Sequence, residues 1–192
     1  ARRHRARAVR QLELRPGAVV LDLGCGTGLN LPLLYGAVGP GGRIICVDLS
    51  PDMLSRARRR AQRLGFMNVE WIQADLATYR LPPDVDCALA TFALEMVPVY
   101  DAIIQRVAAS LPGKGRLAVY GLKHPEQWPG WLVQLGVWIS SPFGVGREYE
   151  TFKPYDAVLK HLSKIEYREF LFGAAYLCVG ERASQQNHEK HR

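Results

Sequence analysis

Residues 19–28, VVLDLGCGTG, limit more than any other stretch what this chain can fold into. The aliphatic run at 19–23 is typical of a strand buried on both faces of a parallel sheet. Three glycines follow at two-residue spacing, and glycine permits positive φ and lets a ligand lie against bare backbone. An apolar pattern resumes at residues 29–34 and predicts a helix whose N-terminus points back at the turn. The stretch therefore predicts a nucleotide-binding strand–turn–helix unit at the carboxyl edge of a doubly wound sheet.

The acidic residue Asp22, two positions before the first glycine, separates this turn from a dinucleotide fingerprint. That fingerprint reads GxGxxG and presents a helix N-terminus to a pyrophosphate. The motif here is GxGxG, formed by Gly24, Gly26 and Gly28, with Cys25 between the first two glycines. A carboxylate repels a pyrophosphate but attracts a ligand that carries an ammonium and a sulfonium, such as S-adenosylmethionine. At these residues the chain resembles the class I S-adenosylmethionine-dependent methyltransferases, whose first motif is an acidic residue followed by GxGxG.

A second acidic residue, Asp48, closes the apolar run at 44–47 and stands 24 residues beyond Gly24. An acid at this distance is placed to accept both ribose hydroxyls of an adenosine-containing cofactor. The stretch VDLSPDMLSRAR is similar to the second motif of the family, and Ser50-Pro51 predicts a helix start. Leu49 and Met53 are candidates to line the adenine, and Met53 has an equal alternative in the helix core.

Two further strand ends complete the predicted cofactor site. Asp75 and Leu76 follow a strand expected at 69–73, and in the resembled family the acid here receives the adenine amino group. The next backbone amide in that family meets a ring nitrogen. For Asp75 alone, a helix cap or a loop carboxylate is the alternative. Thr91 follows a strand expected at 85–90. In the resembled family this region contacts the methionine end of the cofactor and the acceptor.

The resemblance covers residues 17–122 and implies an α/β fold of three layers, doubly wound around a mostly parallel seven-stranded sheet. Residues 165–172 and 174–182 are expected to form a closing antiparallel hairpin. We expect one methyltransferase domain over 1–182, beginning with a basic helix at 1–14 and followed by a polar tail at 183–192. Residues 123–162 are expected to form a variable insert or lid on the substrate side.

Composition and cysteine usage describe an ordinary folded domain. The 192 residues are 48% hydrophobic and 22% charged, and no run reaches the roughly 18 apolar residues that span a bilayer. The four cysteines stand singly, so we expect buried reduced thiols in a cytoplasmic protein and no metal site.

The net charge of +7 is unevenly distributed. Residues 1–64 carry 12 arginines, no lysine and 4 acidic residues. Most of these arginines lie in two basic runs, at 1–10 and 56–60. Such runs favour an anionic surface, either phospholipid headgroups at the periphery of a membrane or nucleic acid. Nucleic acid is the less favoured partner because no aromatic residues interleave with the basic ones. The alternative is two solvated helix faces with no partner.

The segment at 128–143 holds three of the four tryptophans. It is interpreted either as a lid or interfacial segment, or as a helix packed in the fold or at a dimer contact. With the basic first half of the chain, it favours an amphiphilic small acceptor. The core motifs are also similar to those of the quinone-biosynthesis and phospholipid N-methyltransferases, so a quinone-like molecule or an aminophospholipid is the predicted acceptor.

The predicted chemistry is in-line transfer of the sulfonium methyl group, which needs a general base only for a protonated acceptor. His124, Glu95 and Tyr120 are candidates for that base by position, and none is assigned as catalytic. The rival hypotheses are an NAD(P)-dependent oxidoreductase, an aminopropyl transferase and a non-catalytic binding protein that keeps the fold. The oligomeric state is not predicted.

Overall fold

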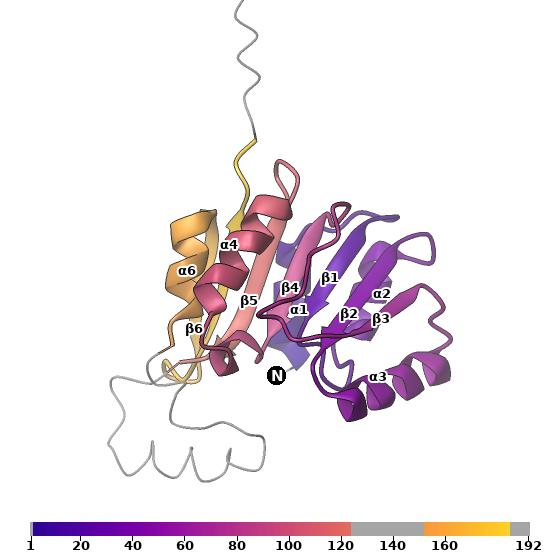
Figure 1. Ribbon diagram of the computed structural model, residues 1–192. Helices are drawn as coiled ribbons and strands as arrows, with labels where there is room; N and C mark the ends of the chain where they lie inside the picture. The colour runs from indigo at the N-terminus through magenta and orange to yellow at the C-terminus, as the bar shows by residue number, and fades with distance from the viewer. Residues whose placement is uncertain (1, 124–151, 185–192) are drawn as a thin grey trace, which may run out of the picture.

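A single seven-stranded sheet forms the centre of the computed structural model, which describes residues 2–123 and 152–184 (Figure 1). Its strands are β1 (Val19–Leu23), β2 (Arg43–Asp48), β3 (Val69–Gln73), β4 (Cys87–Thr91), β5 (Arg116–Leu122), β6 (Ser163–Phe170) and β7 (Ala175–Glu181). The order across the sheet is β3-β2-β1-β4-β5-β7-β6. Strands β1 to β5 are parallel, and β7 runs antiparallel to both β5 and β6. The predicted fold class and closing hairpin are confirmed.

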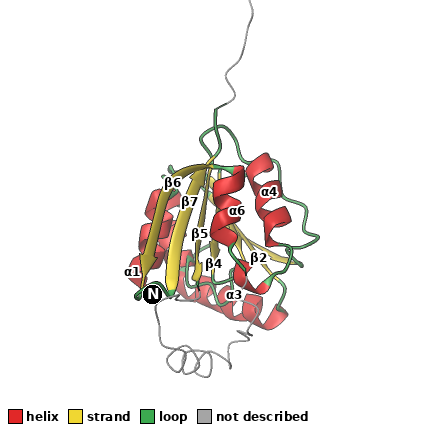
Figure 2. Ribbon diagram, turned by 90° about the vertical axis from the view of Figure 1, so that its left-hand side faces the viewer, coloured by secondary structure: helices red, strands yellow, loops and turns green. Residues whose placement is uncertain are grey.

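Helices cover both faces of the sheet and give the molecule three layers (Figure 2). They are α1 (Arg2–Gln11), α2 (Leu31–Val38), α3 (Pro51–Leu64), the short 3₁₀ helix η1 (Leu94–Met96), α4 (Tyr100–Ser110) and α6 (Pro154–His161). Buried residues of α1, α2 and α3 share one hydrophobic cluster, and those of α4 and α6 share another. Side chains along β1 alternate between these two clusters. Val20 packs in the cluster of α1, α2 and α3, whereas Leu21 and Leu23 pack in the cluster of α4 and α6.

The ends of α3 lie where the sequence predicts them. Ser50 is the N-cap, and its hydroxyl accepts a hydrogen bond from the backbone N–H of Met53 at 3.3 Å. Pro51 occupies the first turn, where no intrahelical donor is lost. Gly65 ends the helix in the left-handed conformation with φ 71°, which satisfies carbonyls of the last turn.

Other boundaries differ from the expectations. The strand expected at 85–90 begins later and runs over β4. Ahead of it, the Asp86 carboxylate accepts a hydrogen bond from Val19 N–H at 2.7 Å. Within the segment expected as a lid, α6 packs beside α4 and contacts β7. Residues 124–151, with the tryptophan-rich stretch, and the tail from 185 onward lie outside the described residues.

The four cysteines are buried and unpaired, as predicted. Across residues 2–123 and 152–184, no group of three or more His, Cys, Asp or Glu side chains could hold a metal ion. No helix in the same part of the chain is both long enough and apolar enough to cross a bilayer.

Gly28 fixes the approach of α3 to the turn after β1. It has φ +73°, and a Cβ there would lie 2.6 Å from Leu31 Cδ1 and 3.1 Å from Ala57 Cβ. A side chain at this position would therefore be strained and would also push α3 away from the turn.

The substitution Gly28→Ala is expected to lower the free energy of unfolding by about 2 kcal/mol or more, from left-handed strain and overpacking. Gly36→Ala is the matched control, because Gly36 lies inside α2 and a Cβ there meets nothing within 4 Å. Alanine at 36 is expected to stabilise the protein by about 0.5 kcal/mol. Urea denaturation of both variants measures the difference, and equal effects would contradict this assignment of the turn.

Candidate functional site

A pocket of about 540 Å³ opens at the carboxyl ends of β1 to β4. Nine of the eleven predicted cofactor residues line it: Gly24, Cys25, Gly26, Asp48, Leu49, Met53, Asp75, Leu76 and Thr91. The two that do not are Asp22 and Gly28. Because parallel strands present their carboxyl ends at one edge, four separate stretches of sequence meet in this cavity.

The Asp48 carboxylate joins the glycine turn to the start of α3. Its Oδ2 accepts a hydrogen bond from Gly26 N–H at 2.8 Å, and its Oδ1 accepts one from Ser50 N–H at 2.9 Å. Each carboxylate oxygen has a second lone pair, so a half-buried Asp48 that lines the pocket can still accept hydroxyl donors from a ligand.

Asp75, Leu49 and Met53 form the wall of the pocket that lies at the ends of β2 and β3. Asp75 Oδ1 accepts a hydrogen bond from Ala77 N–H at 2.8 Å, which is the loop-carboxylate arrangement, and the side chain also lines the pocket. Leu49 is 65% exposed and Met53 38% exposed. Met53 therefore does not belong to the helix core, the alternative that the sequence left open.

Asp22 lies beneath the pocket and is fully buried. Both of its carboxylate oxygens accept hydrogen bonds from Asn30 Nδ2, at 2.9 and 3.1 Å. Burial raises the pKa of this carboxyl to about 7, while the Asn30 hydrogen bond and the charge of Arg5 act in the opposite direction. The sequence predicts that the Asp22 carboxylate contacts the ligand. In the structure this carboxylate is buried and accepts hydrogen bonds from Asn30 instead.

Arg5, on α1, is a pocket residue that the sequence analysis missed. Its Nη1 donates to Asn30 Oδ1 at 2.8 Å and to Thr91 Oγ1 at 2.5 Å, and its guanidinium lies 5.3 Å from the centre of the Phe92 ring. Its buried Nε has no hydrogen-bond partner in the described part of the chain. The basic helix at the N-terminus was visible in the sequence, but no spacing rule links position 5 to positions 30 and 91.

The turn after β4 is strained next to the cavity. Phe92 has φ 55°, which is uncommon for a bulky side chain, and its N–H donates to Tyr120 O at 2.8 Å. A Cβ at Gly24 would lie 2.4 Å from Ala93 Cβ, so the first glycine permits this turn to pack on the turn after β1. Gly26 has open space instead, and a ligand can lie against its backbone.

The two general-base candidates in the described part of the chain, Glu95 and Tyr120, do not line the pocket. Glu95 is 4% exposed, its Oε1 accepts a hydrogen bond from Tyr176 Oη at 2.9 Å, and burial raises its pKa to about 7. Tyr120 is 2% exposed, and its ring packs against Phe92 with centres 4.7 Å apart. His124 lies outside the described residues.

Comparison with known proteins places the site in a family. A family model described as "Methyltransferase domain" matches residues 20–115, half of the 192-residue chain. The 2-phytyl-1,4-naphtoquinone methyltransferase of Thermosynechococcus vestitus is 32% identical over 77% of this chain and 68% of its own length. The trans-aconitate 2-methyltransferase of Methylobacterium nodulans is 38% identical over 57% of this chain, which covers only 40% of that relative.

The fold has relatives among solved structures. The structure of a geranyl diphosphate methyltransferase in complex with S-adenosylmethionine matches 95% of this chain and 85% of that chain with a TM-score of 0.73 at 16% identity. At this identity the likeness is one of fold. The chain thus belongs to the family of S-adenosylmethionine-dependent methyltransferases, as the resemblance of its motifs predicted.

Proposed function

We propose that this protein transfers the methyl group of S-adenosylmethionine to a small amphiphilic acceptor of the quinone type. The observation that carries the proposal is the pocket itself, which has Asp48 and Asp75 among its lining residues at one end and Arg5 with Thr91 at the other. An adenosine needs hydroxyl and amino acceptors, and the amino-acid part of the cofactor needs a partner for its carboxylate.

In this proposal the cofactor lies along the carboxyl edge of the sheet. Asp48 accepts the ribose hydroxyls, Asp75 accepts the adenine amino group, and Leu49, Met53 and Leu76 contact the adenine ring. The backbone of the glycine turn, with Cys25, lies under the methionine part. Support comes from the open space at Gly26 and from the exposed side chains of Leu49 and Met53.

Arg5 is proposed to bind the carboxylate of the methionine part. Its side chain lines the pocket, and the guanidinium gives this part of the pocket a positive charge that suits an anion. Asp22 then acts on the cofactor indirectly, because it holds the Asn30 side chain, which in turn accepts a hydrogen bond from Arg5.

The reaction asks the protein mainly for alignment and exclusion of water, because the sulfonium methyl group is already activated. We assign no general base, since neither Glu95 nor Tyr120 lines the pocket. An acceptor whose attacking atom carries no proton, or loses it in solution, fits this arrangement.

The proposed acceptor class rests on the naphthoquinone methyltransferase relative and on the apolar residues around the pocket, which include Leu29, Met96 and Val97. An aminophospholipid is the second candidate, predicted from the sequence. We propose a cytoplasmic location with peripheral contact to an anionic membrane, where both kinds of acceptor are present.

The variant Arg5→Gln is expected to bind S-adenosylhomocysteine about tenfold more weakly, because a charge-assisted hydrogen bond to the cofactor carboxylate is lost. The same variant is expected to bind 5′-methylthioadenosine as the unchanged protein does, since that nucleoside has no carboxylate. Isothermal titration calorimetry with both ligands makes the comparison. Equal losses for the two nucleosides would remove Arg5 from the methionine end.

With S-adenosylmethionine labelled in the methyl group, we expect label in a reduced 1,4-naphthoquinone presented in detergent. Phosphatidylethanolamine vesicles and trans-aconitate are the comparison acceptors, and both are expected to gain at least about tenfold less label. Label that appears in trans-aconitate alone would refute the quinone-type acceptor. Label in the vesicles alone would favour the aminophospholipid.

Glu95→Gln is expected to keep methyl transfer within about threefold and to change the pH dependence of stability instead. The folded-state pKa of Glu95 is raised to about 7 from 4.5, so the native protein binds the extra proton between these values. The free energy of unfolding therefore falls as pH rises through that window, by up to about 1.4 kcal/mol per pH unit. Glutamine keeps an acceptor for Tyr176 and removes this contribution.

Urea denaturation at pH 5 and pH 7.5 measures that slope for both proteins. Asp22→Asn is the companion variant, because burial raises the pKa of Asp22 in the same direction. A loss of methyl transfer of a hundredfold in Glu95→Gln, with an unchanged slope, would show that Glu95 is the base.

A further inference from the structure

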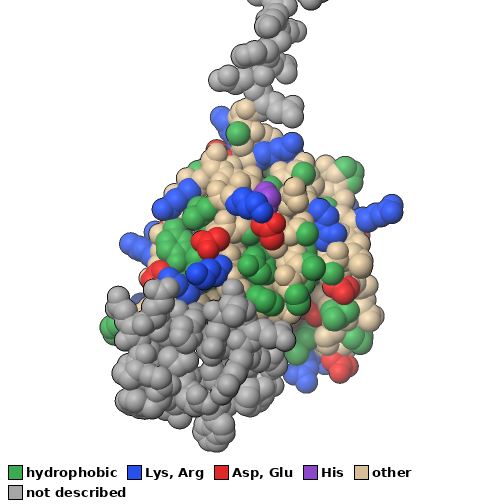
Figure 3. Space-filling model, turned by 60° about the vertical axis from the view of Figure 1, so that its left-hand side comes forward, with side chains coloured by type: hydrophobic (Ala, Val, Ile, Leu, Met, Phe, Trp, Pro, Cys, Tyr) green, Lys and Arg blue, Asp and Glu red, His purple; other side chains and the backbone are tan. Residues whose placement is uncertain are grey.

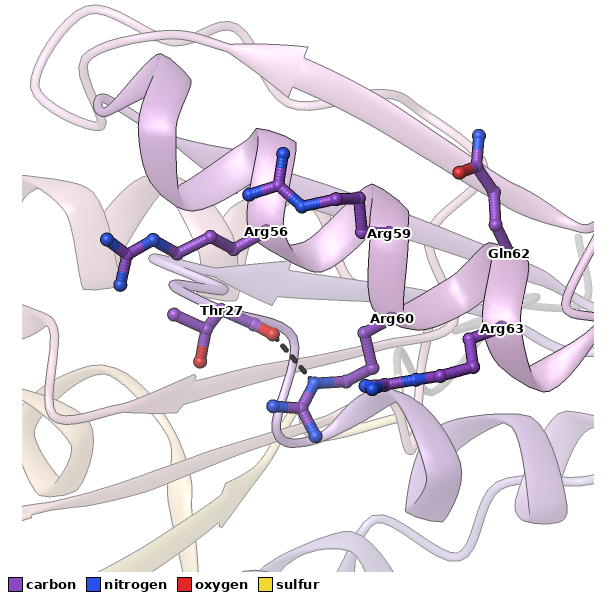
Figure 4. Close-up of a pocket in the computed structure, with 6 residues that line it drawn as sticks. All are labelled: Thr27, Arg56, Arg59, Arg60, Gln62 and Arg63. Atoms are coloured by element: carbon purple, nitrogen blue, oxygen red, sulfur yellow. Dashed lines mark hydrogen bonds between the residues drawn. The ribbon is translucent and has the colours of Figure 1, made fainter.

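A second cavity of about 650 Å³ lies on α3, beside the glycine turn, and four of its six lining residues are arginines. We call it the arginine cavity, and its residues are Thr27, Arg56, Arg59, Arg60, Gln62 and Arg63. In Figure 4 the four arginines extend from α3 in the same general direction, and Arg60 reaches the turn that carries Thr27. Their spacing along the helix places them on one face.

These four guanidinium groups have no acidic partner within residues 2–123 and 152–184. Among the described residues none of them forms an ion pair, and no carboxylate lines the cavity. Two of them donate hydrogen bonds to neutral oxygens, from Arg60 Nε to Thr27 O at 3.0 Å and from Arg59 Nη1 to Ser55 Oγ at 2.8 Å. Like charges three and four residues apart on a helix repel each other. Without a bound anion, the four arginines therefore destabilise α3.

Several other basic side chains in the described residues have a partner for their charge. Arg43 pairs with Glu70 and Asp84, and Arg58, also on α3, lies 6.0 Å from the Trp71 ring. Figure 3 shows acidic and basic side chains interspersed on the side of the molecule that carries α4 and α6. There Lys160 of α6 pairs with Asp101 of α4. A solvated helix face is expected to carry such a mixture of charges. The arginine cavity differs because the charged side chains that line it are all positive.

The arginine cavity adjoins the cofactor pocket. Thr27 and Arg56 line both cavities, and Arg60 holds the carbonyl of Thr27 within the glycine turn. Thr27 directly follows Gly26, whose N–H donates to Asp48, whereas Arg5 donates to Thr91. Thr27 therefore borders the part of the pocket that contains Asp48.

We propose that the arginine cavity is a binding site for phosphate groups and that its occupancy raises the affinity of the neighbouring pocket for S-adenosylmethionine. Guanidinium groups bind phosphate oxygens through paired, charge-assisted hydrogen bonds, and several of them suit a diphosphate or a dense array of headgroups. The phosphate comes either from a soluble polyphosphate or from a lipid headgroup.

The direction of the coupling follows from charge and rests on the proposed function. S-adenosylmethionine carries a net positive charge, whereas S-adenosylhomocysteine is neutral overall. An anion that neutralises the four arginines removes repulsion from the first ligand and leaves the second nearly unaffected. The effect is screened by salt, so it is largest at low ionic strength.

The first experiment is titration calorimetry with inorganic pyrophosphate at low salt. The unchanged protein is expected to bind it, and Arg59→Gln/Arg63→Gln is expected to bind it about tenfold more weakly. Arg3→Gln/Arg10→Gln removes the same charge from exposed positions of α1 and is expected to keep the affinity within about twofold. Equal losses in the two variants would overturn the site, because they would show attraction to overall charge.

Thermal unfolding checks that the α3 variant is folded. Without anion, Arg59→Gln/Arg63→Gln is expected to melt at the same temperature as the unchanged protein or above it, because like-charge repulsion is relieved. Pyrophosphate is expected to raise the melting temperature of the unchanged protein more than that of the variant. No rise in either protein would overturn the proposal.

Co-sedimentation distinguishes the sources of phosphate. Binding to phosphatidylglycerol vesicles but not phosphatidylcholine vesicles, lost in the α3 variant and kept in the α1 variant, supports a headgroup source. Pyrophosphate binding without vesicle binding supports a soluble source. Binding to a nucleic acid duplex alone, with neither pyrophosphate nor vesicles bound, would overturn the proposal.

The coupling is tested by titrating S-adenosylmethionine and S-adenosylhomocysteine with and without pyrophosphate. We expect affinity for the first to rise about two- to threefold and for the second to stay the same. Equal changes would overturn the coupling. If neither nucleoside binds while pyrophosphate does, the proposed function fails and the phosphate site stands.

Discussion

The buried carboxylate of Asp22 is the constraint on which the site depends. A carboxyl without solvent contact inside a parallel sheet is strongly unfavourable unless its oxygens are occupied. Asn30 occupies both of them and also donates to Thr91, and its own oxygen accepts from Arg5. One buried charge thus connects β1 to the start of α2, the end of β4 and the N-terminal helix, and brings a guanidinium to the edge of the pocket.

This connection explains why α1 is part of the site. Ala8, Val9 and Leu12 bury the apolar side of the N-terminal segment against the sheet. Arg5, one turn earlier, then projects over the carboxyl edge and reaches Asn30 and Thr91. Its companion on α1, Arg7, pairs with Glu166 of β6 at 2.5 Å, so the helix is held from both sides. On α3, in contrast, the arginines of the cavity form no ion pair with any residue that the structure describes.

Local rules predicted the elements and most of the pocket. Strand composition, the glycine spacing and the Ser50 and Gly65 caps depend on residues close together in the sequence, and the structure places them as expected. The acids at strand ends, Asp48 and Asp75, follow from the fact that parallel strands share one carboxyl edge. The direction of the Asp22 side chain did not follow, because a strand residue can face the core as well as the ligand. Arg5 and Asn30 were missed because their contact is tertiary and joins residues 25 positions apart.

A crystal structure with S-adenosylhomocysteine is the most direct measurement of the central claim, that the carboxyl edge of β1 to β4 holds this nucleoside. We expect ribose hydroxyls hydrogen-bonded to the Asp48 carboxylate, the adenine beside Asp75 and Met53, and the amino-acid carboxylate on Arg5. A nucleoside bound elsewhere, or bound here in the reverse direction with its adenine against Phe92, would contradict it.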